Sequence, residues 1–368
     1  MDGPDVVIAG GGPAGLATAI RARQAGFEVV VLDAAGPTID KACGEGLMPD
    51  GVEVLASLGV ELEAVETRAF HGIRYVDGDL VAEGRFPGAP GLGIRRTALH
   101  QALSRRAAQT GVDLRWGTRV LGLAEGGFAT DGGVVTGRWL VGADGRTSRV
   151  RRWAGLDGRK AKRRRIGLRR HYAIEPWTDL VEVSWHDRCE AYVTPVGDRL
   201  VGVAMLFEGG PNDFGALLAQ FPKLQERLFG APVASTDRGA GPLEQRCRRV
   251  VSGNLAVVGD AAGYLDAITG EGLALAFHQA TAVVAAILEG DLGGYRLAHR
   301  RIVRYPTAVT RLLLEVERRP RLRRRVMRSL SCDPSLMSRF LALKMRRDGP
   351  RLLGSGGLLP LSLAVLRG

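Results

Sequence analysis

The sequence has few cysteines, few histidines and no long apolar run, and each shortage excludes a class of protein. The four cysteines are scattered and form no C-x-x-C pair, which argues against a zinc site or a disulfide framework. The six histidines show no H-E-x-x-H spacing, and no G-x-S-x-G elbow is present, so metal catalysis and serine hydrolysis are disfavoured. No apolar run approaches the ~20 residues that span a bilayer. With no signal peptide expected before the first motif, we predict a reduced, cytoplasmic protein.

Basic residues outnumber acidic ones, and the excess is concentrated in one part of the chain. The 368-residue chain carries 51 Lys and Arg against 39 Asp and Glu, a net charge of +12. Residues 300–351 contain sixteen basic and four acidic residues, which accounts for the excess. We interpret the charge as solvated helix faces, and the alternative is a surface for anionic lipid, a phosphopantetheine carrier or coenzyme A. Nucleic acid is the least favoured partner because no binding motif accompanies the charge.

The first 33 residues contain a glycine-rich turn between two apolar strands. The order is strand, G-x-G-x-x-G turn, helix, second strand and an acid at its end. The first glycine permits the tight turn, the second lets the backbone approach a pyrophosphate, and the third lets the helix pack closely. The helix N-terminus faces the phosphates, and the acid accepts hydrogen bonds from a ribose. We therefore expect a bound dinucleotide at Gly10, Gly12, Pro13, Ala14, Gly15 and Asp33.

Two more glycine-rich turns follow apolar strands later in the chain. The first comes after residues 139–141, and Ser148 is placed to cap the helix that follows it. The second comes after residues 254–258 and leads into an apolar helix at 271–289. The residues of interest in these turns are Asp144, Gly145, Gly259, Asp260, Gly270 and Gly272.

The remaining pattern predicts an α/β fold. Residues 69–83 and 166–206 alternate with period two, with turns at 77–79 and 197–198, and they interrupt the cofactor segments. We expect a Rossmann-like FAD-binding domain, an inserted β-sheet substrate domain, and a helical C-terminal region with breaks at Pro306 and Pro320, followed by an apolar tail at 352–366. The predicted boundaries are 1–65, 96–165 and 251–293 for the FAD-binding domain, 66–95 and 166–250 for the substrate sheet, and 294–368 for the helical region.

The three motifs, in this order, resemble the flavin monooxygenase superfamily with the para-hydroxybenzoate hydroxylase fold. The resemblance implies that Asp33 binds the adenosine ribose of FAD, that Asp260 binds the ribityl hydroxyls, and that Arg96 approaches the FAD phosphates. It also implies that Asp144 and Gly145 serve FAD, and that NAD(P)H is the reductant. The start of the helix near 271 would stabilise negative charge on the reduced flavin.

Other segments resemble particular branches of this superfamily. Lys41, Cys43 and Gly44 lie in a segment similar to the Lys-x-Cys-Gly motif of geranylgeranyl reductases, which implies a place beside the flavin. The same reductases carry a further motif, Tyr-x-Trp-x-Phe-Pro, and residues 190–195 align with it. Tyr192 occupies the position of the Trp, and the other two aromatic residues of the motif are absent. Flavin-dependent halogenases share part of residues 43–49, but their Trp-x-Trp-x-Ile-Pro signature is absent. The mix resembles flavoproteins encoded beside bacterial polyketide and phenolic-lipid enzymes.

The resemblance favours a monooxygenase that uses FAD and NAD(P)H to hydroxylate a lipophilic aromatic or polyketide-type small molecule through a flavin C4a-hydroperoxide. The alternative is a geranylgeranyl-reductase-like ene reductase of an isoprenoid; a flavin-dependent halogenase ranks third, and a flavin-binding sensor or adaptor has no specific support. No metal is expected. The substrate would be carrier- or membrane-associated, with the protein peripheral at the membrane surface. The candidate catalytic residues are Cys43, Tyr192 and His186, and Tyr172 and Trp185 are further candidates for substrate contact.

Overall fold

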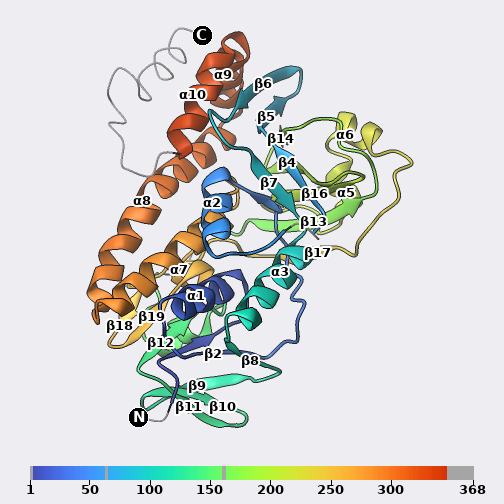
Figure 1. The fold of residues 1–368 in the computed structure, drawn as a ribbon. Helices are drawn as coiled ribbons and strands as arrows, with labels where there is room; N and C mark the ends of the chain where they lie inside the picture. The colour runs from blue at the N-terminus through green and yellow to red at the C-terminus, as the bar shows by residue number, and fades with distance from the viewer. Residues whose placement is uncertain (1–2, 63–64, 160–162, 346–368) are drawn as a thin grey trace.

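The computed structural model describes residues 3–62, 65–159 and 163–345, and a six-stranded sheet forms one layer of the fold (Figure 1). The strand order is β18-β19-β12-β1-β2-β8, parallel throughout except for β18. The strands are β1 (Val6–Ala9), β2 (Val29–Asp33), β8 (Asp113–Trp116), β12 (Trp139–Gly142), β18 (Val251–Ser252) and β19 (Leu255–Val257). The β1 and β12 strands are buried along their whole length, as expected of central parallel strands covered on both faces.

Three helices pack with this sheet and carry the predicted motifs. They are α1 (Pro13–Gln24), α3 (Arg96–Gln109) and α7 (Gly272–Leu288), and α1 lies against both of the others. Gly10 has a φ of +114°, and a Cβ there would lie 2.4 Å from the carbonyl oxygen of Ala143. A Cβ at Gly15 would lie 1.8 Å from the carbonyl oxygen of Gly10. The tight turn and the close helix packing are therefore as the sequence predicts.

A seven-stranded sheet forms the second layer and draws its strands from two separate parts of the chain. Its order is β17-β13-β16-β15-β14-β5-β6, and the β5–β14 pairing is parallel. The strands are β5 (Gly72–Asp77), β6 (Leu80–Arg85), β13 (Ile166–Tyr172), β14 (Val181–His186), β15 (Cys189–Gly197), β16 (Leu200–Phe207) and β17 (Arg238–Ala240). The β5–β6 and β15–β16 pairs confirm both predicted hairpins.

Smaller elements complete the two layers. The strands β3 (Gly46–Leu47), β4 (Thr67–Phe70) and β7 (Gly91–Ile94) form their own sheet, so residues 66–95 contribute strands to two sheets rather than one. A third small sheet contains β9 (Val120–Ala124), β10 (Gly127–Thr130) and β11 (Gly133–Thr136). The short helices are α2 (Pro49–Ser57), α4 (Arg149–Trp153), α5 (Phe214–Leu218) and α6 (Pro222–Arg227), and Ser148 caps α4 as expected.

The C-terminal helices are α8 (Leu292–Glu317), α9 (Pro320–Cys332) and α10 (Pro334–Met345). Helix α8 lies along α7, whereas α9 and α10 pack against the β5–β6 side of the second sheet (Figure 1). The predicted break at Pro320 is confirmed, but the predicted break at Pro306 is wrong because α8 continues through it. Tyr305, Pro306 and Val309 all lie on the buried face of α8, and the packing of that face offsets the hydrogen bond that proline cannot make. The expected apolar tail at 352–366 lies outside the described residues.

Candidate active site

A cavity of about 530 Å³ lies where the three sequence motifs meet the second sheet. Its lining includes most of the residues that the sequence predicted for the cofactor, together with one candidate catalytic tyrosine. These are Gly12, Pro13, Ala14, Lys41, Cys43, Gly44, Arg96, Asp144, Gly145, Tyr192, Gly259, Asp260, Gly270 and Gly272. Residues from 12 to 272 therefore meet around one space.

A second cavity, of about 360 Å³, opens at the carboxyl ends of β1, β2 and β12. Gly10 and Asp33 line it, and it shares Gly12, Lys41 and Asp144 with the first cavity. The Asp33 carboxylate is oriented by the Gly11 and Ala35 backbone N–H groups, which donate to it at 2.7 and 2.8 Å. Ligands of open α/β sheets bind at these strand ends, and the two cavities with their shared lining residues lie where such a fold would hold a dinucleotide. Gly15 lines neither cavity.

Arg96 provides a direct test of whether this space suits FAD. The side chain is buried, and its Nη1 has no hydrogen-bond partner among the described residues. A Cβ placed on Gly12 would lie 3.8 Å from Arg96 Nη2, so the guanidinium sits beside the first glycine turn. Burial lowers the pKa of this guanidinium, and an anion beside it would offset that cost. The FAD pyrophosphate supplies such an anion, and the residues fit it.

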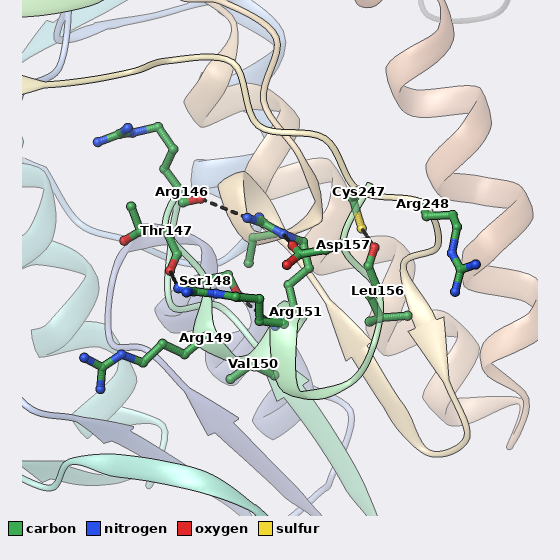
Figure 2. A network of polar contacts seen from close by, with 12 residues as sticks. Arg146, Thr147, Ser148, Arg149, Val150, Arg151, Leu156, Asp157, Cys247 and Arg248 are labelled. Carbon is green, nitrogen blue, oxygen red and sulfur yellow. Dashed lines mark hydrogen bonds and ion pairs between the residues drawn. The ribbon is translucent and has the colours of Figure 1, made fainter. Parts of the chain in front are cut away.

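Arg151 makes hydrogen bonds that link the turn after β12 to the turn after β19, and Figure 2 shows its surroundings. The guanidinium donates to the Asp157 carboxylate at 2.6 Å and to the Arg146 carbonyl at 3.3 Å. It also donates to the backbone carbonyls of Asp260 and Ala261, at 3.4 and 3.1 Å. Because the side chain is buried, these bonds fix the turn that carries Asp260 relative to the turn that carries Asp144.

Asp260 is half-buried in the cavity wall. Burial raises its pKa, whereas the nearby Arg146, Arg96, Lys41 and Arg151 oppose that shift. A carboxyl that lines the cavity can accept hydrogen bonds from a ligand there, and the ribityl hydroxyls of FAD would be suitable donors.

Glu45 joins the loop after β2 to both layers of the fold. Its backbone has a φ of +58°, a conformation that residues other than glycine seldom adopt. Its carboxylate accepts the Arg96 N–H at 2.8 Å and lies 2.5 Å from His171 Nε2. Arg169 contacts Asp40 and His171, and its Nε is 3.9 Å from the Glu45 carboxylate. This buried cluster positions Cys43 and Gly44 between the start of α3 and the strand β13.

Tyr192 begins a second buried polar network at the other side of the cavity. Its hydroxyl donates to the Glu190 carboxylate at 2.5 Å and contacts the Ile268 carbonyl at 3.2 Å. The other Glu190 oxygen accepts from Arg165 at 2.7 Å, and Arg165 also donates to Asp266 at 3.1 Å. Burial is the main reason that the pKa of Tyr192 lies well above 10 and that of Asp266 is raised to about 6.

Comparison with known proteins identifies the fold and its cofactor. Residues 4–170 match the FAD binding domain family. These similarities support membership of the FAD-dependent monooxygenase-type superfamily. It is an FAD-dependent oxidoreductase whose relatives include both reductases and a monooxygenase.

Three curated relatives illustrate that range. A menaquinone reductase of Mycolicibacterium smegmatis is 28% identical over 80% of this chain and 78% of its own length. Digeranylgeranylglycerophospholipid reductase 1 of Methanothermobacter thermautotrophicus is 26% identical over 80% of both chains. The 6-methylpretetramide 4-monooxygenase of Streptomyces rimosus is 35% identical, but over only 41% of each chain. The flavoprotein/dehydrogenase from Cytophaga hutchinsonii has a TM-score of 0.82 at 18% identity, over 99% of this chain and 98% of that one. That last likeness shows the fold.

Three residues that the sequence proposed for substrate contact do not line the cavities. His186 is exposed at the end of β14 and packs against Phe221, with ring centroids 5.9 Å apart. Val181 and Val183 of the same strand line the cavity, and His186 points to the opposite face because side chains alternate along a strand. Trp185 is buried against Tyr75, and Tyr172 is buried beside Phe214. The structure therefore argues against substrate contact for His186, Trp185 and Tyr172.

Several site residues escaped the sequence analysis. Glu45 lies inside the Lys41–Gly46 segment, but the resemblance of this segment to the reductases rests on the residues beside Glu45 and gives Glu45 no role. Glu190 was noted only as the residue that replaces an aromatic one, although a carboxylate two positions before Tyr192 in a strand shares its face. Arg165 carries no motif signal in the sequence. Nothing local in the sequence indicated that Arg165 and Asp266 would meet.

Proposed function

We propose that the protein is an NAD(P)H-consuming monooxygenase that hydroxylates a lipophilic phenol. The observation that carries this proposal is the hydrogen bond from Tyr192 to the fully buried Glu190. Of the two acceptors within reach of the Tyr192 hydroxyl, Glu190 is the closer, at 2.5 Å against 3.2 Å for the Ile268 carbonyl. With its proton donated to Glu190, the Tyr192 oxygen can accept a hydrogen bond from a substrate hydroxyl. The substrate proton then moves to Tyr192 while the Tyr192 proton moves to Glu190, which leaves an electron-rich phenolate ring.

The apolar walls of the cavity support a lipophilic substrate. Its residues from β4, β5, β14 and β15 carry no charged group and include Phe70, Ile73, Tyr75, Val181 and Val183. Such walls bind an apolar ring or chain and keep water from the reaction. Bound FAD, reduced by NAD(P)H, would supply the activation of O₂. We further propose a cytoplasmic location and a small-molecule substrate.

A second candidate is reduction of a carbon–carbon double bond in an isoprenoid-type lipid. It is favoured by the two reductases that match this chain over about four-fifths of its length. Cys43 is suited to this reaction because burial raises the pKa of its thiol, which therefore keeps its proton at neutral pH. In this case Cys43 or Tyr192 would give a proton to one alkene carbon while reduced FAD gives a hydride to the other.

Oxygen dependence separates the two functions. Purified protein loaded with FAD is mixed with NADPH or NADH and either a long-chain alkylresorcinol or a polyprenyl quinone. Oxygen uptake that depends on the phenol, with one ¹⁸O atom from ¹⁸O₂ in the product, supports hydroxylation. Anaerobic turnover of the polyprenyl quinone that adds two hydrogens to a double bond of its side chain would overturn hydroxylation in favour of reduction. The added hydrogens must remain after the ring is re-oxidised to the quinone, because reduction to the quinol alone also adds two hydrogens.

A further inference from the structure

The exposed face of α9 is a stripe of arginines. Arg321, Arg324, Arg325 and Arg328 are all exposed, and their spacing of three, four and seven residues puts them on one face of the helix. The opposite face carries apolar residues that are packed into the core cluster with α8, α10 and the second sheet. We call these four residues the α9 stripe. Figure 1 shows α9 at the end of the molecule remote from the six-stranded sheet.

The α9 stripe lacks acidic partners. None of its four arginines forms an ion pair with an acidic residue in the described part of the chain. Arg323, on the same helix, differs because it is buried and pairs with Asp77 at 3.2 Å. Asp79 lies near Arg324 but pairs with Lys223 at 2.9 Å. The helix thus uses one arginine in its structure and presents the others to solvent.

We propose that the α9 stripe docks the protein on the surface of an anionic lipid bilayer. Arginines near such a surface are attracted by its negative potential without any need for insertion. Insertion is not available to α9 because its apolar face is already buried in the protein core. Among residues 3–62, 65–159 and 163–345, no helix has the length and apolar character to cross a membrane. The attachment is therefore electrostatic and reversible.

A bilayer fits this surface better than an acidic protein partner does. Protein interfaces need a desolvated centre, usually of aromatic or other large apolar side chains. None of the exposed large apolar residues in the described chain belongs to α9, and the nearest in sequence is Leu312 on α8. The inference rests on the proposed function in one respect: a lipophilic phenol would partition into the same bilayer.

The test is sedimentation of the full-length, FAD-loaded protein with vesicles. We expect binding to phosphatidylcholine vesicles that contain about 30% phosphatidylglycerol, little binding to pure phosphatidylcholine, and loss of binding in roughly 0.5 M salt. Replacing the α9 stripe by Gln should weaken binding at least tenfold. The matched control removes the same charge from exposed arginines on the first layer of the fold, and it should bind as the wild type does. The control variant replaces Arg105, Arg138, Arg248 and Arg249 by Gln.

Three results would overturn the docking surface: no vesicle binding at low salt, equal binding to neutral vesicles, or undiminished binding by the stripe variant. Capture of an acidic carrier protein in place of vesicles would overturn it as well. Vesicle binding needs no turnover, so a wild type that binds vesicles but hydroxylates no phenol would refute only the proposed function. With a short-chain phenol in solution, the stripe variant should turn over as fast as the wild type.

Discussion

Glu190→Gln removes the final proton acceptor of the Tyr192 network while the surrounding charges stay balanced. Arg165 now lies between two carboxylates, those of Glu190 and Asp266, at 2.7 and 3.1 Å. With Gln at position 190, one guanidinium faces one carboxylate, so no buried charge is left unpaired. The amide oxygen can still accept a hydrogen bond from Tyr192, and the fold should persist.

The expected result is a loss of turnover without a loss of substrate binding. General-base catalysis contributes roughly 10²–10⁴-fold, so we expect kcat to fall at least about 100-fold, or about 2.7 kcal/mol in activation free energy. KM should change little because Gln keeps the shape of the site. Raising the pH should restore part of the rate, since hydroxide replaces the missing base. The assay is phenol-dependent O₂ uptake at several pH values.

Glu182→Gln is the matched control. Glu182 is also buried, lies on the adjacent strand β14 and pairs with Arg74 at 3.2 Å, yet it does not line the cavity. The relay would be refuted if Glu190→Gln turned over within twofold of the wild type. Equal losses in the two variants would also refute it, because they would point to a general effect of the substitution on the sheet.

Three further changes test other parts of the structure. Gly10→Ala places a methyl group 2.4 Å from the Ala143 carbonyl oxygen at a φ of +114°, so the purified variant should be colourless and fail to take up added FAD. The pKa of Asp266 is raised to about 6 by burial, so the native state holds more protons than the unfolded state between about pH 4 and 6. Asp266 therefore contributes about 3 kcal/mol of stability at low pH that is lost as the pH rises through this interval. In urea titrations at a series of pH values, the difference between the wild type and Asp266→Asn should change by about this amount. Glu45→Ala leaves the buried Arg169 with less compensating charge and should lower the free energy of unfolding by about 3–5 kcal/mol in the same titrations, whereas an unchanged midpoint would contradict its role.

The parts of the fold that the sequence predicted correctly are encoded locally. A strand, glycine turn, helix and second strand occupy consecutive residues up to Asp33, and each step has its own residue signal. The hairpins at 78–79 and 198–199 are local in the same way, because alternation and a turn residue define them. Pro306 shows the limit of local rules, since the packing of a buried helix face outweighs the preference of one residue.

The polar networks could not be predicted because they depend on contacts between distant residues. Arg165 meets Glu190 across 25 positions and Asp266 across 101. Charged residues are also expected at the surface, so composition gives no reason to place these three in the interior. His186 was misplaced for a different reason: its residue type suggested chemistry, whereas its position in β14 directs it away from the cavity.

The ionisation of a bound phenol tests the account most directly. A lipophilic nitrophenol is titrated into the oxidised, FAD-loaded protein without NAD(P)H, and its absorbance reports the fraction bound as phenolate across pH. If Tyr192 and Glu190 take up the substrate proton, the bound phenol should ionise at a lower pH than it does in water, and Tyr192→Phe should abolish that shift. A bound phenol that ionises as it does in water, or one that shifts equally in the wild type and in Tyr192→Phe, would contradict the proposed relay.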